Sequence, residues 1–435
     1  MCSKNLWYLL LSITASLLIM VPTAAAAQTT TPGLVRVKLV DQADSLGFTV
    51  SGHYQLVDQA TGKLIVKLKP GERWLVTLQD GRVALVGEDG KNGLYKGPVS
   101  VQVQKHIFQA SVLSGNGVQV DKDGAGELTV MNSDGKVLSL EQVLAGITFK
   151  GAEGMVTLGE GEVEGKSLNL LSLISNAGKT RYRGDLEFLV DGGKLTVINE
   201  LNIEDYLCGV VPAEAIPSWP AEALKAQAVA ARNYCLQKVE ISRGDSYNLV
   251  CDQYNQVYGG YDAETEATNE AVKDTSGIVM MSQGSLITAL FHSCSGGFTE
   301  NSEDVWLNSL PYLKWKADPY DENDDFYNWQ VKYSNKQLAA LMTGAGYPIK
   351  KVTDIKVEDR TSSGARVKSL TVTGVDTAGK SVKIEIGNAE VVRTTLGLKS
   401  ALFVLDKSYN KDKSLDGVEI TGRGFGHGVG MSQYG

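Results

Sequence analysis

The chain has 435 residues, enough for two or three domains with cores of their own. Its 42 lysines and arginines stand against 50 aspartates and glutamates, which gives a formal net charge of −8. This acidic balance argues against nucleic acid as a partner and against an anionic polymer held by bulk charge. A ligand would have to be recognised through local hydrogen bonds and ring stacking.

The N-terminus carries Lys4, an apolar run from Leu6 to Val21 and then a row of alanines. This pattern is typical of a secretory signal peptide, and we place its cleavage after Ala27. The apolar run is shorter than the ~20 residues of a membrane span. A cleaved signal is therefore favoured over an uncleaved anchor, and only such an anchor would bring the chain to a membrane. Removal of residues 1–27 changes the net charge from −8 to −9, because it takes away one lysine and no acid.

Residues 35–170 contain short runs in which apolar and polar residues alternate, such as VRVKLV, KLIVKLK, WLVTLQ and VSVQVQ. Turn-forming residues separate the runs, as in DQATGK and QDGR. Alternation with period two between turns predicts antiparallel strands. Because no titratable cluster here indicates catalysis, we interpret the region as a scaffold or a binding part.

From Arg181 onward the sequence mixes strand and helix patterns, which indicates an α+β domain with a mixed sheet and a central helix. LEFLV and KLTVINEL are predicted strands. Residues 263–273 and 330–344 are predicted helices, and residues 355–405 are rich in predicted strands.

The segment Val210–Arg232 sets one carboxylate, Glu214, among apolar side chains that we expect to exclude water from it: Val210, Val211, Ile216 and Trp219. Loss of water disfavours the charged carboxylate, so the pKa of Glu214 is expected to be raised. A carboxyl that holds its proton near neutral pH is what cleavage of a glycosidic bond requires. The alternative is a surface loop residue that precedes a packed helix.

That helix has Ser218 as its expected N-cap and Pro220 in its first turn. Small and apolar residues recur at helical spacing and predict a buried face: Leu224, Ala228, Ala231 and Cys235. Lys225 and Arg232 lie seven residues apart, hence on nearly one face. We expect that face either to line a substrate cleft or to be solvated.

The last 14 residues, GRGFGHGVGMSQYG, carry alternating glycines that let the backbone approach a ligand closely. The spacing does not fit a dinucleotide-binding loop. His427 is a candidate to hydrogen-bond a substrate or to orient Glu214, and Ser432 and Gln433 are candidates to contact sugar hydroxyls. The alternative for His427 is an imidazole satisfied inside a tight glycine turn.

Four cysteines follow the signal segment: Cys208, Cys235, Cys251 and Cys294. An even number in an exported chain permits two disulfides in three connectivities, and four unpaired buried thiols are the alternative. Cys294 lies near His292, but no oriented base or oxyanion device accompanies it, so a thiol nucleophile is not favoured.

Four stretches agree, in order, with one family: RYRGDLEFLVDGGKLTVINELNIEDYL, YLCGVVPAEAIPSWPAEALKAQAVAARNYC, FHSCSGGFTENSEDVW and the closing GRGFGHGVGMSQYG. Together they closely resemble the SpoIID/LytB family (stage II sporulation protein D and its relatives) over residues 181–435. Family members typically continue beyond this last motif, so the end at Gly435 is consistent with a truncated domain.

The resemblance implies a SpoIID-like fold and a lytic transglycosylase that acts on peptidoglycan glycan strands without stem peptides. Its catalytic glutamate falls on Glu214, although the family usually reads Glu-Met-Pro where this chain reads Glu-Ala-Ile-Pro. Further positions in the shared stretches are candidates for substrate binding: Arg232, Gln256, Tyr258 and Ser295. The family also includes an enhancer of a cell-wall amidase, so membership alone does not imply an enzyme.

We expect no cofactor and no metal. Some relatives bind zinc through Cys and His, but Asn255 and Gln256 stand here where a His–Cys pair would be expected. Cys251, His292 and Cys294 are scattered ligands and form weak evidence for a metal site.

Three functional hypotheses follow. The first is an exported cell-wall lytic transglycosylase in which Glu214 acts as both acid and base, giving anhydro-muramyl ends. The second is a non-catalytic wall-binding enhancer of an N-acetylmuramoyl-L-alanine amidase. The third is a hydrolase in which Asp252 or Glu300 activates water, because hydrolases normally use a pair of carboxylates.

Overall fold

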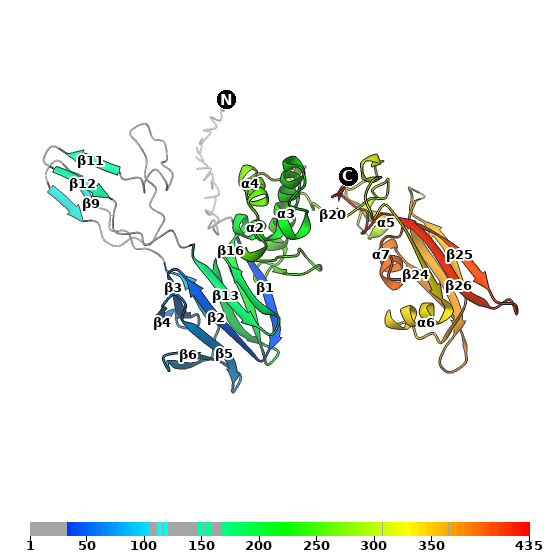
Figure 1. Cartoon of the computed structure of the whole chain (residues 1–435), viewed down its shortest axis with the longest axis horizontal. Coiled ribbons are helices and arrows are strands. Elements are labelled where there is room, and N and C mark those ends of the chain that lie inside the picture. Colours follow the sequence, from blue (N-terminus) through cyan, green and yellow to red (C-terminus); the bar gives the residue numbers. More distant parts are fainter. Residues whose placement is uncertain are drawn as a thin grey trace, which may run out of the picture.

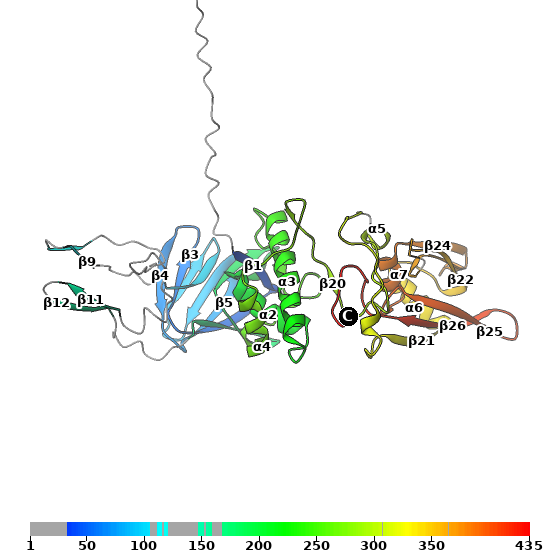
Figure 2. The ribbon, with the colours of Figure 1, turned by 90° about the horizontal axis from the view of Figure 1, so that it is seen from above.

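The computed structural model describes residues 33–104, 111–114, 117–120, 147–151, 154–158, 168–306, 308–363 and 365–435. The expected signal peptide or anchor, residues 1–27, lies outside these ranges. The described chain forms two lobes, which Figures 1 and 2 show side by side along the long axis. In both views the C-terminus lies between the lobes, next to strand β20 (Phe291–His292).

The first lobe is built on two sheets, with the strand orders β17-β1-β16-β15-β8-β3-β4 and β14-β13-β2-β5-β6-β7. Neighbouring strands are antiparallel, except that β17 runs parallel to β1. The strands are β1 (Leu34–Ala43), β2 (Ser45–Ser51), β3 (Tyr54–Asp58), β4 (Lys63–Leu68), β5 (Arg73–Gln79), β6 (Arg82–Gly87), β7 (Asn92–Tyr95), β8 (Val99–Val103), β13 (Leu170–Ser175), β14 (Gly178–Tyr182), β15 (Asp185–Asp191), β16 (Lys194–Asn202) and β17 (Leu249–Val250).

Alternating apolar residues turn one face of each sheet toward a common core. In β2, Leu46, Phe48 and Val50 are buried. The Phe48 ring stacks on Phe188 of β15, in the other sheet, with ring centroids 5.5 Å apart. These strands confirm the predicted β-rich, antiparallel N-terminal region.

The pairing of the strands does not follow the expected division of the chain. β1 pairs with β16, and β2 pairs with β13. The boundary expected between residues 170 and 181 therefore falls inside one body of paired strands. Alternation along a strand is a local signal and does not encode which strand will be its partner.

Three helices complete the first lobe: α2 (Ile203–Glu214), α3 (Ala221–Ile241) and α4 (Glu266–Asp274). All four residues of the predicted buried face of α3 are buried. The expected cap is wrong, because Pro220 rather than Ser218 occupies the N-cap position and no side chain caps the helix. α4 begins after Thr265, whose hydroxyl accepts a hydrogen bond from the Thr268 N–H, close to the predicted start.

The second lobe contains two three-stranded antiparallel sheets, β21-β26-β25 and β22-β23-β24, which enclose one core with two helices. Its elements are β21 (Asn328–Ser334), α6 (Asn335–Gly344), β22 (Lys351–Arg360), β23 (Val367–Val375), β24 (Ser381–Gly387), α7 (Ala389–Thr395), β25 (Phe403–Tyr409) and β26 (Leu415–Arg423).

The predicted helix over residues 330–344 is half correct. Residues 328–334 form β21, which pairs with β26, and helix α6 starts only at Asn335. Ser334 and Gln337 form a capping box at that start. The boundary lies there because β21 pairs with a strand more than 80 residues further along the chain.

Short elements complete the described fold: β9 (Ser111–Ser114), β10 (Gly117–Val120), β11 (Ile147–Gly151), β12 (Gly154–Leu158), η1 (Tyr261–Ala263), β18 (Met281–Ser282), β19 (Ser285–Leu286), α5 (Ser302–Val305), η2 (Pro319–Asp321) and β27 (Met431–Ser432). The mixture confirms the α+β class. Within the described ranges, no helix is both long and apolar enough to cross a bilayer.

Candidate active site

Glu214 is the last residue of α2, a helix that the sequence reasoning did not predict. The Asn202 side chain caps its start by accepting a hydrogen bond from the Glu204 N–H, at 2.8 Å. Ala215 is the C-cap that follows Glu214, and its N–H donates to the Val211 carbonyl. Glu214 is therefore placed by a regular element rather than by a loop.

The carboxyl of Glu214 is partly buried and accepts a hydrogen bond of 2.6 Å from the Val257 N–H. Burial raises the pKa of Glu214 above its usual value, and the hydrogen bond from Val257 offsets only part of that rise. Val210 and Val211 are buried as expected, but Ile216 is 43% exposed and does not shield the carboxyl. The direction of the pKa shift agrees with the sequence-based expectation.

This raised pKa predicts a pH-dependent stability difference between the wild type and Glu214→Gln. The folded protein holds the Glu214 proton more tightly than the unfolded chain, so this group favours folding at low pH. We expect the stability of the wild type, relative to the variant, to fall as the pH rises through the window from about 4.5 to the raised pKa. Urea unfolding of both proteins between pH 4 and pH 8 measures the difference, and a constant difference would contradict the shift.

The glycine-rich tail (residues 422–435) reaches Glu214 from the second lobe. Strand β27 of the tail pairs in parallel with β20. Gln433 then donates from Nε2 to the Glu214 carbonyl at 2.8 Å and to Gln227 Oε1 at 3.2 Å. The Tyr434 ring meets Trp219 edge-on, with centroids 5.0 Å apart. The tail therefore lies beside Glu214, as the expected site requires.

His427 does not orient Glu214. Its Nδ1 accepts a hydrogen bond of 3.0 Å from the Val429 N–H, and its ring lies against Trp306 and His292, with centroids 4.9 and 5.5 Å away. Burial, with the nearby arginines, lowers the pKa of His427 to about 3, so the imidazole is neutral at physiological pH. This corresponds to the alternative of a histidine satisfied within a glycine turn. Ser432 accepts a hydrogen bond from the Gly435 N–H and is partly exposed.

Arg232 does not line a substrate cleft. It is 1% exposed and forms a two-pronged ion pair with Glu204, at 2.8 and 2.7 Å. It also donates to the carbonyls of Val272 and Ile278. These contacts join α2, α3 and the end of α4, so the geometry corrects the expectation: Arg232 is a structural residue.

The other candidates that the family stretches suggested are also buried. Gln256 is fully buried and donates to the Ala231 carbonyl, while Tyr258 donates to Asn199 at 3.0 Å. The Ser295 hydroxyl donates to Asp321 at 2.8 Å. The expectation that these three residues contact a substrate is therefore wrong. A single sequence does not distinguish a residue that a family keeps for folding from one that it keeps for binding.

All four described cysteines are free thiols. Cys294 is buried, and its thiol donates to Asp321 at 3.2 Å. Burial raises the pKa of the Cys294 thiol, which opposes a nucleophilic role. Among the residues that the structure describes, no three His, Cys, Asp or Glu side chains are grouped so as to hold a metal ion.

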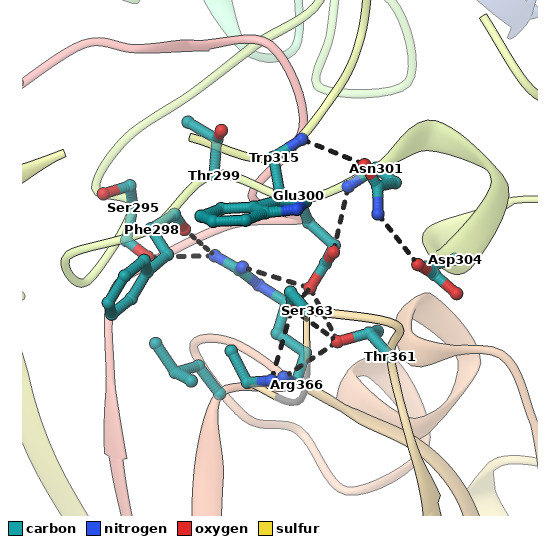
Figure 3. Close-up of polar contacts among 12 residues, drawn as sticks. Ser295, Phe298, Thr299, Glu300, Asn301, Asp304, Trp315, Thr361, Ser363 and Arg366 are labelled. Atoms are coloured by element: carbon teal, nitrogen blue, oxygen red, sulfur yellow. Dashed lines mark hydrogen bonds and ion pairs between the residues drawn. The ribbon is translucent and has the colours of Figure 1, made fainter. Parts of the chain in front are cut away.

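Glu300, one of the two acids of the hydrolase hypothesis, belongs to a buried polar network (Figure 3). Glu300 is 0% exposed and lies 3.7 Å from the Arg366 guanidinium. It also accepts hydrogen bonds from the hydroxyls of Thr361 and Ser363, both at 2.7 Å. With its carboxylate enclosed, Glu300 is not placed to activate water. Asp252, the other acid of the hydrolase hypothesis, is exposed and accepts the Tyr254 N–H.

The same network holds the tail in place. The Glu300 N–H donates to the Gly428 carbonyl at 2.7 Å, and Arg366 donates from Nη2 to the carbonyls of Ser295 and Phe298. Gly428 has φ +81°, and a Cβ there would lie 2.2 Å from Arg366 Nη2. The glycine is needed because the guanidinium occupies the space of a side chain.

Gly428→Ala is therefore expected to destabilise the protein by about 1–3 kcal/mol, since Arg366 cannot move without giving up its carbonyl partners. Gly344→Ala is the matched control, because it lies at the end of α6 with open space around its Cα and without a positive φ. Thermal unfolding of the two variants measures the contrast. Equal melting temperatures would contradict this packing.

Sequence reasoning missed the Val257 N–H and did not assign a role to Gln227. A backbone donor carries no side-chain signal, and its position depends on the loop that follows β17. Gln227 lies on the predicted central helix, one turn from Leu224. The sequence therefore predicts its place on a helix but does not indicate that Gln433 is its hydrogen-bond partner.

Comparisons with known proteins fit this arrangement. A family model described as stage II sporulation protein matches residues 191–281, and a model described as a domain of unknown function matches residues 300–430. An uncharacterized protein of Brachyspira hyodysenteriae is 34% identical over 275 residues, 58% of this chain and 65% of that protein. The amidase enhancer of Bacillus subtilis is 34% identical over 274 residues, 53% of this chain and 36% of the enhancer. The chain thus spans less than two thirds of either relative.

Stage II sporulation protein D of Bacillus subtilis is 31% identical over 261 residues, which cover 55% of this chain and 68% of that protein. The chain belongs to the SpoIID/LytB family.

Proposed function

We propose that the protein is a lytic transglycosylase that cleaves the glycan strands of peptidoglycan after their peptides have been removed, with Glu214 as its acid and base. Family membership supports a cell-wall-related function. The observation that carries the finer proposal is the state of Glu214. The carboxyl of Glu214 has a raised pKa and accepts a short hydrogen bond from the Val257 N–H. The backbone carbonyl of Glu214 accepts a hydrogen bond from the side chain of Gln433.

In the proposed reaction, protonated Glu214 gives its proton to the glycosidic oxygen as the bond from that oxygen to C1 of muramic acid breaks. The resulting carboxylate takes the proton of the C6 hydroxyl of the same sugar, and O6 bonds to C1. Glu214 is then protonated again, and the product ends in an anhydro-muramyl ring. One carboxyl suffices, because no water has to be activated.

The contacts of the other acids support this choice over a hydrolase. Glu300 accepts two hydroxyl donors and faces Arg366, while Asp252 accepts a backbone N–H within its own turn. In the part of the chain that the structure describes, neither acid forms a hydrogen bond with Glu214, whose carboxyl accepts from the Val257 N–H. A second catalytic carboxylate at the spacing that hydrolases use is therefore not supported by these residues.

The proposal includes export to the cell wall, on the strength of the signal-like N-terminus. It also includes peptidoglycan glycan as the partner, and excludes nucleic acid because of the acidic balance of the chain.

A second candidate is a wall-binding enhancer of an amidase, which the similarity to the amidase enhancer of Bacillus subtilis favours. A chain of this kind would bind glycan and raise the rate of an added amidase without cutting strands itself. The raised pKa of Glu214 would then have no chemical use.

Digestion of peptide-stripped glycan strands tests the proposal. Mass spectrometry of the soluble fragments is expected to show ends one water lighter than ordinary reducing ends. Intact strands, together with faster release of stem peptides from peptide-bearing peptidoglycan by an added N-acetylmuramoyl-L-alanine amidase, would support the enhancer instead.

A further inference from the structure

We propose that Gln227 is a positioning residue, which with Gln433 forms an amide pair that fixes the end of helix α2 and thereby the direction of the Glu214 carboxyl. The inference rests on the proposed function of Glu214 and adds a residue that supports it. Gln227 lies on α3 in the first lobe, and Gln433 lies on the tail of the second lobe.

The hydrogen bonds determine which side of each amide, that of Gln433 and that of Gln227, carries the oxygen and which the NH₂ group. The Glu214 carbonyl belongs to the last turn of α2, where carbonyl groups have no partner within the helix. It accepts from Gln433 Nε2 at 2.8 Å, which requires the amino side of the Gln433 amide to face it. The remaining hydrogen of that amino group points to Gln227, which must present its oxygen, at 3.2 Å.

A glutamine at position 227 lowers the stability of the fold compared with an apolar side chain, so packing alone does not explain it. Gln227 is 1% exposed, and its Nε2 has no hydrogen-bond partner among the described residues. A buried donor without a partner loses its hydrogen bonds to water and gains none in return, and an apolar side chain of similar size would avoid that cost. Such an exception calls for an explanation, and the acceptor that Gln227 offers to Gln433 supplies one.

The amide pair completes a two-point hold on Glu214. The Val257 N–H holds the carboxylate from the first lobe, while Gln433 holds the carbonyl from the second. Because the carbonyl and the side chain share one Cα, a shift of that Cα when the helix end loosens would move the carboxyl as well. A misplacement of about 1 Å can cost about 10²-fold in rate. Since Gln227 is buried, it should affect the chemical step and not ligand affinity.

The test compares three variants of the full chain on peptide-stripped glycan. Gln227→Met keeps the volume but removes the acceptor, and we expect kcat to fall about 10–100-fold with KM unchanged. Gln227→Glu restores an accepting oxygen and should recover most of that loss. Gln237→Met is the matched control, because Gln237 also lies on α3 and donates across to Thr288 at 2.6 Å, away from Glu214. It should leave kcat unchanged.

A measurement without substrate separates this inference from the proposed function. Gln227→Met should speed amide hydrogen exchange in residues 210–216, and Gln237→Met should not. If the wild type cuts no glycan but this exchange contrast is seen, the proposed function fails and the amide pair stands. Unchanged exchange in Gln227→Met, a rise in KM alone, equal losses in the Gln227→Met and Gln237→Met variants, or no recovery in Gln227→Glu would each overturn the positioning role.

Discussion

Glu214→Gln is expected to lower the rate of glycan cleavage by roughly 10²–10⁴-fold while leaving the fold intact. The amide cannot give a proton to the glycosidic oxygen or take one from the C6 hydroxyl. It can still fill the volume and accept the Val257 N–H, so the site should remain assembled. Release of anhydro-ended fragments over time measures the loss.

Glu222→Gln is the matched control for this substitution. Glu222 lies at the start of α3, and its side chain is 85% exposed, with Lys225 beside it. Its replacement should leave the cleavage rate within about a factor of two, since exposed ion pairs contribute little. Equal activity of Glu214→Gln and the wild type would remove Glu214 from the chemistry.

Arg366→Met is expected to destabilise the protein by about 3–5 kcal/mol, the usual cost of removing one member of a buried ion pair. The substitution leaves the Glu300 carboxylate buried with hydroxyl and backbone donors only (Figure 3). It also frees the carbonyls of Ser295 and Phe298. Because the tail is tied to this network through Gly428, cleavage activity should fall together with stability.

Arg393→Met provides the comparison, since Arg393 pairs with Glu390 one turn away on α7, and the two side chains keep 23% and 25% of their surface exposed. We expect it to cost less than about 1 kcal/mol. Urea unfolding of the two variants measures the difference. A similar small cost for Arg366→Met would mean that the buried pair does not stabilise the second lobe.

Local patterns predicted the parts of this molecule that depend on local physics. Alternation identified the strands of the first lobe, and helical spacing identified the buried face of α3. The apolar neighbours of Glu214 predicted the direction of its pKa shift, although Ile216 proved exposed.

The features that sequence reasoning missed depend on partners far along the chain. β21 is a strand because β26 pairs with it, and Glu300 is buried because Arg366 and two hydroxyl side chains converge on it. Arg232 was read as a cleft residue because its spacing from Lys225 was visible and its pairing with Glu204 was not. Such contacts become visible only once the chain is folded.

Cleavage of peptide-stripped glycan in water enriched in ¹⁸O tests the central claim most directly. If Glu214 delivers the C6 hydroxyl rather than water, the new muramic acid ends should contain no solvent oxygen. One ¹⁸O atom in each new end would identify a hydrolase and contradict the account.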